Sequence, residues 1–286
     1  MEMQIFVCIK QVPDSGQIRV HPVTNTIMRQ GVPTIINPYD LFGLEQALRL
    51  RDRFGGEVTV MTMGPPMAVD SLRKALTYGA DRAVLLTDRV FAGSDTLATS
   101  YALSNLIRKA GETWGAPDIV FCGKQTIDGD TAQVGPGIAR RLGLSQLTYV
   151  SGIDDMDLTD RQILVRRRGD HGVQVLRSRL PVMVTMMEGS NEIRRGTQAD
   201  ALRAARAEVV QWNAATVGIP DVSLCGLRGS PTVVKKVFAP TARDETAEMV
   251  PTTDLSPAAM ADALIDRIFT RQPALQDDLL RQAAGH

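Results

Sequence analysis

The sequence lacks the residues that build metal sites and disulfide frameworks. Its 286 residues include three cysteines and three histidines, and both sets are widely spaced. Neither set has the spacing of a zinc site or of paired disulfides, so we expect no bound metal. Cys8 and Cys122 lie in apolar runs, where a cysteine usually acts as a small hydrophobic residue.

An excess of charge of either sign is also missing. Lysine and arginine total 32, aspartate and glutamate total 32, and the net charge is zero. A nucleic-acid-binding protein needs a basic surface, so we expect no nucleic-acid partner. Aromatic residues make up only 5% of the chain. No apolar run approaches the roughly 20 residues of a membrane helix, and no signal peptide is evident. We therefore expect a cytoplasmic protein without membrane insertion.

The zero net charge hides two regions of opposite charge. Residues 161–206 contain ten arginines, no lysines and four acids, a net charge of +6. Residues 244–286 contain eight acids and three arginines, a net charge of −5. Charge complementarity tunes the rate and specificity of protein association, so we interpret both regions as protein-facing surfaces. Two solvated faces without partners are the alternative.

The pattern of apolar residues predicts an α/β fold. Short apolar runs alternate with helical patterns over about the first 150 residues, which indicates a mostly parallel, Rossmann-like sheet with helices on both faces. Residues 163–168 and 173–178 alternate like antiparallel strands. The expected strands are residues 4–9, 57–62, 83–86, 118–122 and 182–185, the expected helices begin near residues 38, 67, 94, 131 and 198, and an irregular hairpin is expected at residues 17–28.

The pattern also divides the chain into two parts. We expect residues 1–210 to form a nucleotide-binding α/β domain and residues 211–286 to form an arm. Within the arm, Ser256 and Pro257 have the chemistry of a helix start. The helix that follows carries Met260, Leu264 and Ile268 on one face. Because this amphipathic arm has no core of its own, we expect it to dock on another subunit and the chain to be unstable alone.

One loop has the composition of a phosphate-binding site. Residues 123–131 follow a predicted strand, and ligands of parallel sheets bind outside the carboxyl ends of the strands. Residues 130–135 then place free amide groups at a helix start, which favours a phosphate. A capped helix with a polar entrance loop is the alternative. Gly135 and Gly137 do not fit the dinucleotide fingerprint, and no Walker A loop or nucleophilic triad is present. These features favour nucleotide binding without side-chain catalysis.

Several stretches resemble the beta subunit of electron transfer flavoproteins, including the nitrogen-fixation-associated FixA branch. The resemblance covers most of residues 3–236. His171 departs from the acidic residue or glycine that is usual there. The stretches that carry the resemblance are residues 7–14, 37–40, 79–83, 122–133 and 165–185, of which residues 122–133 are the most specific.

The resemblance implies a heterodimer with an alpha subunit, whose FAD exchanges electrons with acyl-CoA dehydrogenases or a membrane quinone oxidoreductase. Housekeeping members hold AMP in the beta subunit. Bifurcating members hold a second FAD there, which accepts a hydride from NADH and sends electrons to ferredoxin or flavodoxin and to the alpha flavin. Residues 91–99 resemble the bifurcating branch, so FAD and NAD are the expected cofactors and AMP the alternative. A simple helix cap by Ser94 or Asp95 remains the plainer interpretation of that segment.

The same resemblance assigns binding roles and no catalytic side chain. Cys8, Asn37, Asp40 and Met63 would line the adenosine pocket. Four residues would serve the flavin half of the ligand: Phe91, Asp95, Thr96 and Thr99. The ribose and phosphates would be wrapped by Gly123, Lys124, Gln125, Asp128, Gly129, Asp130, Thr131, Ala132, Gln133, Val134 and Gly135.

The partner-recognition stretch departs from the housekeeping pattern. Housekeeping members have Asn-x-Pro-Arg, an anchoring leucine and a lysine-rich helix. Here residues 191–194 lack the proline, Gln198 occupies the leucine position, and alanine and arginine surround Arg203 and Arg206. Because an anchoring leucine would be an interface hot spot, we infer a different docking partner. Drift in a solvent-exposed loop is the alternative. A third hypothesis, an unrelated ATP-binding α/β stress protein, leaves the arm and the Asp128 loop unexplained.

Overall fold

The computed structural model describes residues 2–14, 33–232, 247, 249–250 and 253–284. The chain divides into two compact units, Met1–Phe238 and Ala239–His286. The hairpin expected at residues 17–28 lies outside the described residues. The main sheet continues past residue 210, because β11 (Val209–Trp212) pairs with β5 (Arg82–Leu86).

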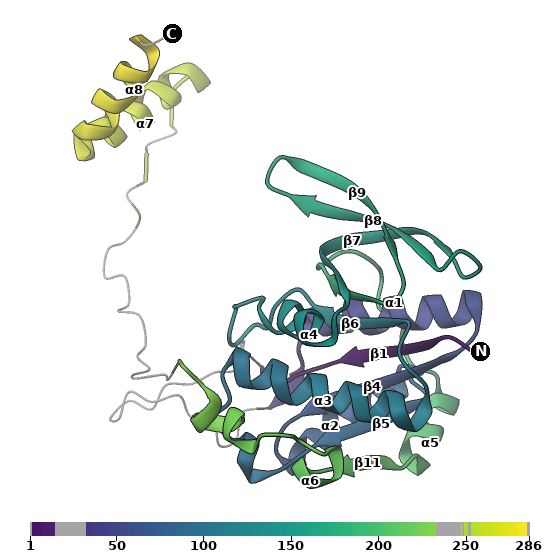
Figure 1. Cartoon of the computed structure of the whole chain (residues 1–286). Helices are drawn as coiled ribbons and strands as arrows, with labels where there is room; N and C mark the ends of the chain where they lie inside the picture. The colour runs from purple at the N-terminus through teal and green to yellow at the C-terminus, as the bar shows by residue number, and fades with distance from the viewer. Residues whose placement is uncertain (1, 15–32, 233–246, 248, 251–252, 285–286) are drawn as a thin grey trace. The chain divides into compact units, whose positions relative to one another are not determined.

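A nine-stranded sheet forms the centre of the first unit within the described residues (Figure 1). Its order is β11-β5-β4-β1-β6-β10-β7-β8-β9. The strands from β11 to β7 run parallel, whereas β8 and β9 add an antiparallel wing. The remaining bounds are β1 (Gln4–Cys8), β4 (Glu57–Met63), β6 (Ile119–Gly123), β7 (Ser145–Asp157), β8 (Gln162–Gly169), β9 (Gly172–Arg179) and β10 (Val182–Met186), with a separate antiparallel pair of β2 (Gln11–Pro13) and β3 (Thr34–Ile36).

Helices cover both faces of the sheet, as the sequence predicts. Successive side chains of a strand point to opposite faces, so Ile5 and Val7 join one apolar cluster while Phe6 and Cys8 join the other. The first cluster includes α1 (Pro38–Phe54), α2 (Val69–Thr77) and α5 (Gln198–Arg206). The second includes α3 (Thr96–Trp114), α4 (Val134–Leu142) and α6 (Ala214–Val217). Short 3₁₀ turns lie at η2 (Pro66–Ala68), η3 (Arg89–Phe91), η4 (Val222–Leu224) and η5 (Gly226–Gly229).

Two elements differ from the sequence prediction for clear backbone reasons. The helix expected from Thr131 begins at Val134, because Asp130 and Ala132 adopt positive φ angles of 53° and 55°. That geometry is incompatible with a right-handed helix. The long strand β7 is not signalled by its sequence, since its burial pattern is irregular and its pairing with β8 shifts register twice.

The second unit contains two helices, α7 (Pro257–Arg271) and α8 (Pro273–Ala284). The predicted helix start is confirmed: Ser256 accepts a hydrogen bond from the Ala259 amide at 3.2 Å, and Pro257 occupies the first helical position. No residue of α7 is buried, and Leu264 is 49% exposed. The unit therefore presents its apolar face without a core beneath it. None of the described helices is long and apolar enough to cross a bilayer.

Candidate functional site

The strand order places a topological switch point between β1 and β6. From β1 the chain moves outward through β4 and β5, and it then returns to form β6 on the other side of β1 (Figure 1). The loops that leave β1 and β6 at their carboxyl ends diverge there, which is where open α/β sheets bind ligands. The predicted residues Cys8 and Gly123 are the last residues of these two strands.

Asp40 joins the ends of the two strands. Its carboxylate accepts hydrogen bonds from the Lys10 amide at 2.7 Å and from the Gly123 amide at 3.0 Å. The side chain is buried, and burial raises its pKa to about 7 even though hydrogen bonds from Asn37 and the two amides act in the opposite direction. Asp40 therefore contributes to the site by fixing the backbone around it.

Asn37 extends this support into the loop after β6. It is fully buried, its side-chain amide donates to the Gln125 carbonyl at 2.9 Å, and its side-chain oxygen accepts from the Ile127 amide at 3.3 Å. The structure thus brings together the predicted residues from the N-terminal end of α1 and from the β6–α4 loop. Their polar atoms are directed at the protein backbone, so they shape the loop from beneath.

Two predicted glycines allow close packing at the same place. A Cβ atom on Gly123 would lie 2.6 Å from the backbone of Tyr39 and from the Asp40 carboxylate. A Cβ atom on Gly135 would lie 2.7 Å from the Thr185 methyl group. Both glycines therefore let helices α1 and α4 approach the sheet, a contact inside the protein that the sequence pattern did not indicate.

The β6–α4 loop is closed by an ion pair that includes a residue absent from the predicted set. Lys10 Nζ lies 2.8 Å from the Asp128 carboxylate, and both side chains are partly exposed. Burial opposes ionisation of Asp128, but the hydrogen bond and charge of Lys10 outweigh it and lower the pKa of Asp128. Lys10 lies two residues after the end of β1, and its place in the sequence, directly after the apolar run of residues 5–9, is the signal that could have found it.

The rest of this loop is mostly accessible. Gln125 donates to Asp130, whose positive φ helps turn the chain toward α4. Lys124 instead pairs with Glu188 at 3.0 Å and lies over the Tyr39 ring, away from the Lys10–Asp128 pair. The first amides of α4 have no intrahelical acceptor, so they can bind an anion. The exposed predicted residues here are Asp128, Gly129, Asp130, Thr131 and Gln133.

The second predicted half meets the first through one side-chain contact. Thr96 Oγ1 donates to Gln133 Oε1 at 2.7 Å, which joins the first turn of α3 to the residue preceding α4. Two helix N-termini therefore lie beside each other. Asp95 caps α3, accepting from the Leu97 and Ala98 amides at 2.9 and 3.0 Å, as one interpretation of the sequence predicted. Thr99 lies in the same first turn and is half-buried.

Four members of the predicted set belong to the apolar cluster under α3 or pack against it: Cys8, Phe91, Met63 and Val134. Phe91 is 5% exposed within the cluster under α3, and Met63 packs against the same cluster. Cys8 and Cys122 are also buried there, and neither forms a disulfide. Burial and the neighbouring Cys8 thiol raise the pKa of the Cys122 thiol. These residues support the site from below, consistent with the expected role of the cysteines as small hydrophobic groups.

The donor set fits a phosphate-bearing nucleotide. It combines two adjoining helix N-termini, a polar loop, and the Lys10 ammonium at a topological switch point. Among the described residues no group of three metal-binding side chains exists.

Comparison with known proteins identifies the family. A family model for the electron transfer flavoprotein domain matches residues 24–217. The chain belongs to the electron transfer flavoprotein beta-subunit family. It is 72% identical over 284 residues to a protein named FixA from Azorhizobium caulinodans, covering 99% of this chain and 100% of that relative. It is 59% identical over 281 residues to FixA of Azotobacter vinelandii, covering 98% and 100%.

More distant relatives carry the subunit name itself. The electron transfer flavoprotein subunit beta of Megasphaera elsdenii is 41% identical over 273 residues, which cover 94% of this chain and 99% of the relative. The subunit beta of Clostridium acetobutylicum is 46% identical over 234 residues, which cover 82% and 87%. Membership of this flavoprotein family implies a flavin or nucleotide cofactor in general.

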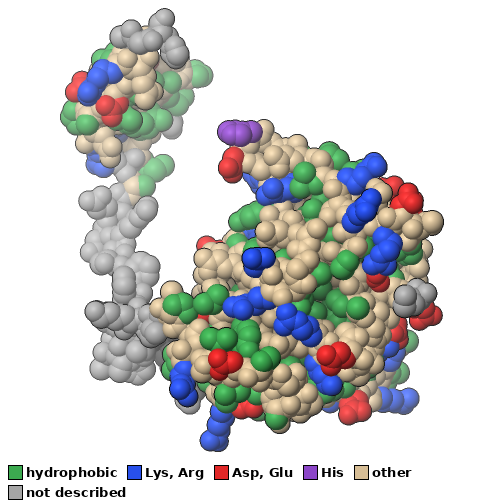
Figure 2. Space-filling view, viewed as in Figure 1, with side chains coloured by type: hydrophobic (Ala, Val, Ile, Leu, Met, Phe, Trp, Pro, Cys, Tyr) green, Lys and Arg blue, Asp and Glu red, His purple; other side chains and the backbone are tan. Residues whose placement is uncertain are grey.

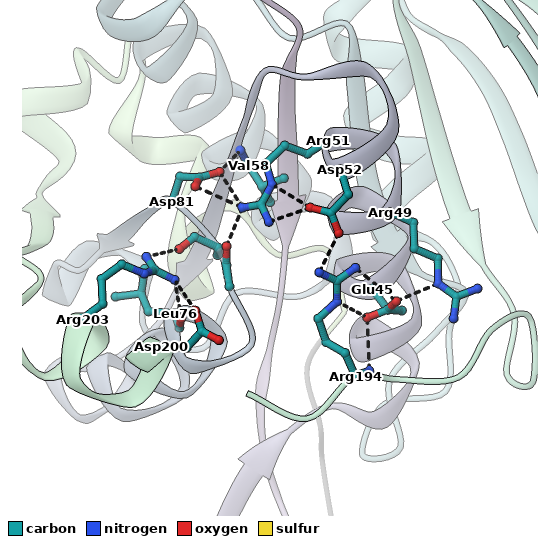
Figure 3. Close-up of polar contacts among 12 residues, drawn as sticks. Glu45, Arg49, Arg51, Asp52, Val58, Leu76, Asp81, Arg194, Asp200 and Arg203 are labelled. Carbon is teal, nitrogen blue, oxygen red and sulfur yellow. Dashed lines mark hydrogen bonds and ion pairs between the residues drawn. The ribbon is translucent and has the colours of Figure 1, made fainter. Parts of the chain in front are cut away.

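Residues 191–206, which the resemblance assigns to partner recognition, are bound firmly to α1 and α2 (Figure 3). Arg194 pairs with Glu45 and Asp52 of α1, each at 2.8 Å. Glu45 is only 3% exposed; burial opposes its ionisation, but Arg194 and Arg49 outweigh that effect and lower its pKa. Arg203 donates to the carbonyls of Ala80 and Leu76. The segment is therefore held in a defined position.

The basic stretch of residues 161–206 is partly neutralised by local acids. Arg161 pairs with Asp118 at 2.9 Å and Arg166 pairs with Asp154 at 2.7 Å. Arg194 and Arg203 also have acidic partners. Figure 2 shows Lys and Arg side chains interspersed with apolar and acidic ones over the visible face of the first unit. The excess of arginine in this stretch is therefore divided between side chains that pair with acids of the same chain and side chains on the surface.

Proposed function

We propose that this chain is the beta subunit of a heterodimeric, electron-bifurcating electron transfer flavoprotein that binds a second FAD. The observation that carries the proposal is the Thr96–Gln133 contact, which sets the first turn of α3 beside the start of α4. A dinucleotide has two linked phosphates, and two adjoining helix N-termini supply amide donors for both. The partner is an alpha subunit, and the setting is cytoplasmic.

Residues 123–135, Thr96 and Thr99 would hold the second FAD, which would supply hydride acceptance from NADH and one-electron transfer to ferredoxin or flavodoxin and to the alpha-subunit FAD. The protein's own residues bind and orient it. Asn37 and Asp40 hold the β6–α4 loop, and residues 123–135 wrap the ribose and phosphates. Thr96 and Thr99 serve the phosphate nearest the flavin. From the alpha flavin, electrons continue to an acyl-CoA dehydrogenase or a quinone oxidoreductase.

A housekeeping beta subunit with structural AMP is the second candidate. The capping role of Asp95 and the burial of Phe91 favour it, because both side chains are already engaged within the protein. AMP has a single phosphate and needs only the donors around α4. On this alternative, the α3 half of the site is an ordinary capped helix.

Counting cofactors in the purified heterodimer separates the two candidates. Bifurcation requires two FAD per heterodimer, with the two sites at about equal occupancy. It also requires that NADH bleach the absorbance of both flavins. One FAD plus one AMP, identified after acid release, would refute the second-FAD proposal. The number of FAD molecules depends on the cofactor site in this chain and not on which dehydrogenase or quinone oxidoreductase the heterodimer serves.

The departures in residues 191–198 lead us to propose a docking partner other than the conventional acyl-CoA dehydrogenases. The segment is fixed on α1 by Arg194, so a change in its exposed residues changes the surface directly. The purified heterodimer should transfer electrons slowly to or from a conventional medium-chain acyl-CoA dehydrogenase. Efficient transfer in that stopped-flow assay would remove the different-partner proposal and leave the flavin count unaffected.

A further inference from the structure

The flavin half of the proposed site is in contact with a segment that lies about 130 residues later in the chain. The Leu227 amide donates to the Ala92 carbonyl at 3.2 Å, and the Gly226 amide donates to Ser94 Oγ at 3.1 Å. Gly226 has a φ of 59° and approaches the Val90 carbonyl so closely that no Cβ atom would fit. Residues 225–232, here called the strap, therefore lie directly on the loop that precedes α3.

Asp95 is the residue at which the strap and α3 meet. One carboxylate oxygen accepts from the Leu97 and Ala98 amides, which caps the helix. The other accepts from the Thr232 hydroxyl at 2.8 Å and from the Thr232 amide at 3.2 Å. An N-cap needs only the first of these two sets of contacts. The second set connects the cap to the strap and has no function in helix capping.

Ser230 and Cys225 show that the strap packs against the first unit, because both side chains are buried. Ser230 is 8% exposed; its hydroxyl accepts from the Asp95 amide at 2.8 Å and donates to the Gly226 carbonyl at 2.7 Å. Cys225 is 2% exposed and belongs to the apolar cluster under α3. Four donors converge on the Asp95 carboxylate; burial opposes its ionisation, but the Ala98 amide and Thr232 outweigh that effect and lower its pKa.

We propose that Asp95 is a positioning residue that couples the strap to the first turn of α3, so that the flavin half of the site is complete only when residues 225–232 are seated. The proposal rests on the proposed second FAD. Ser230 and Thr232 are its partners: Ser230 accepts from the Asp95 amide and Thr232 donates to the Asp95 carboxylate, directly before the turn in which Thr96 meets Gln133.

Coupling of this kind is reciprocal. If a seated strap strengthens FAD binding, then FAD must stabilise the seated strap by the same factor. The affinity for FAD at the α3 half of the site and the accessibility of Cys225 therefore report the same equilibrium, between a seated and an unseated strap. Each can be measured without the activity of the loaded protein.

The first test measures FAD affinity in the purified heterodimer with Asp95→Ser and Thr232→Val. Serine keeps the N-cap but cannot reach Thr232, and valine removes only the hydroxyl. We expect FAD at the beta site to bind about tenfold more weakly with Asp95→Ser and about threefold more weakly with Thr232→Val. Loss of a negative charge beside a phosphate would by itself strengthen binding, so a purely electrostatic role for Asp95 predicts the opposite sign.

The matched control is Asp200→Ala. Asp200 belongs to the capping box of α5, which packs on the opposite face of the sheet. Its replacement removes the two hydrogen bonds that the Asp200 carboxylate accepts from Thr197 and should leave FAD affinity at the beta site unchanged. An Asp95→Ser heterodimer that binds FAD as tightly as the wild type, or more tightly, overturns the coupling.

The second test uses the rate at which a maleimide labels Cys225, located by peptide mass spectrometry. Saturating FAD should slow labelling of Cys225 in the wild-type heterodimer severalfold and should protect it much less in Asp95→Ser. Equal protection in both proteins would contradict the coupling, while the second FAD would stand. A wild-type heterodimer that never takes up a second FAD refutes the proposed function, and the coupling with it.

Discussion

The two halves of the candidate site are fixed by partners of different kinds. The β6–α4 half is held by Asn37 and Asp40, two buried side chains at the start of α1. The α3 half is held by Ser230 and Thr232, from a strap at the end of the first unit. The first half is therefore built into the centre of the sheet, whereas the second depends on a peripheral segment.

This difference separates a half of the candidate site that buried residues hold from a half that a peripheral segment holds. Breaking the supports of the first half should affect folding and binding together, because they lie among buried residues. Breaking the supports of the second half should affect binding with little loss of stability. The following four predictions compare these costs, beginning with the largest expected effect.

Gly123→Ala should cause the largest loss. Its methyl group would meet the Tyr39 backbone and the Asp40 carboxylate at 2.6 Å, and backbone atoms cannot move aside cheaply. We expect a destabilisation of about 3 kcal/mol and loss of bound nucleotide. The matched control is Gly129→Ala in the same loop, where the nearest atom is the Thr126 hydroxyl at 3.2 Å. Thermal unfolding of the heterodimer checks both, and equal melting temperatures would disprove the close packing.

Asp40→Asn should cost roughly 2 kcal/mol, because one of the two amides that face the carboxylate loses its acceptor. The pH dependence gives a second measurement. The pKa of Asp40 is about 7 in the folded protein, against 3.8 ordinarily, so the folded state retains a proton that the unfolded state releases. Stability from this group is therefore fully present below about pH 4 and declines as the pH rises to about 7. The variant should lack this decline; a wild-type pH profile in Asp40→Asn would contradict the assignment.

The Lys10–Asp128 pair should contribute little to stability. Both side chains are partly exposed, so a double-mutant cycle with Lys10→Met and Asp128→Asn should give about 0.5 to 1 kcal/mol. The lowered pKa of Asp128 means that this contribution is present above its ordinary pKa and is lost as the pH falls through the folded value. Nucleotide affinity should fall more in Lys10→Met, which removes a cation, than in Asp128→Asn. The reverse order would exclude Lys10 as a phosphate ligand.

Thr96→Val tests the contact between the two halves and should have the smallest effect on stability. Loss of the 2.7 Å hydrogen bond to Gln133 should cost about 0.5 kcal/mol. Thr99→Val, three residues later in the same first turn, is the matched control and should leave stability nearly unchanged. The release rate of the beta-site cofactor should rise in Thr96→Val. An unchanged rate would mean that the two helix starts bind independently.

The sequence predicted the strands and helices that surround the site because their patterns are local. Residues 57–62 are rich in β-branched and apolar residues, and Ser256-Pro257 is a helix start that needs no tertiary contact. The same reasoning failed at Thr131, where the positive φ of Asp130 and Ala132 delays the helix to Val134. It also gave no indication of β7, because that strand is half-exposed and its register is irregular.

For the site, the motifs identified which residues gather at the sheet edge but not what their atoms do. Asn37 and Asp40 were expected as ligand-lining residues, and the structure directs their polar atoms to the backbone of Gly123, Gln125 and Ile127. Lys10 was absent from the predicted set because its partner, Asp128, lies 118 residues away. Such pairings depend on which strands become neighbours, and no local pattern records that.

By itself, the sequence determined the α/β class, the loop that opens toward α4, the cap at Asp95 and the family, since each follows from local composition or from a contiguous motif. Only the tertiary structure decided that the starts of α3 and α4 meet, that Asp40 joins β1 to β6, and that Thr232 returns to Asp95. The physical reason is that these contacts link residues 30 or more positions apart. Their geometry exists only after the sheet has set its strand order.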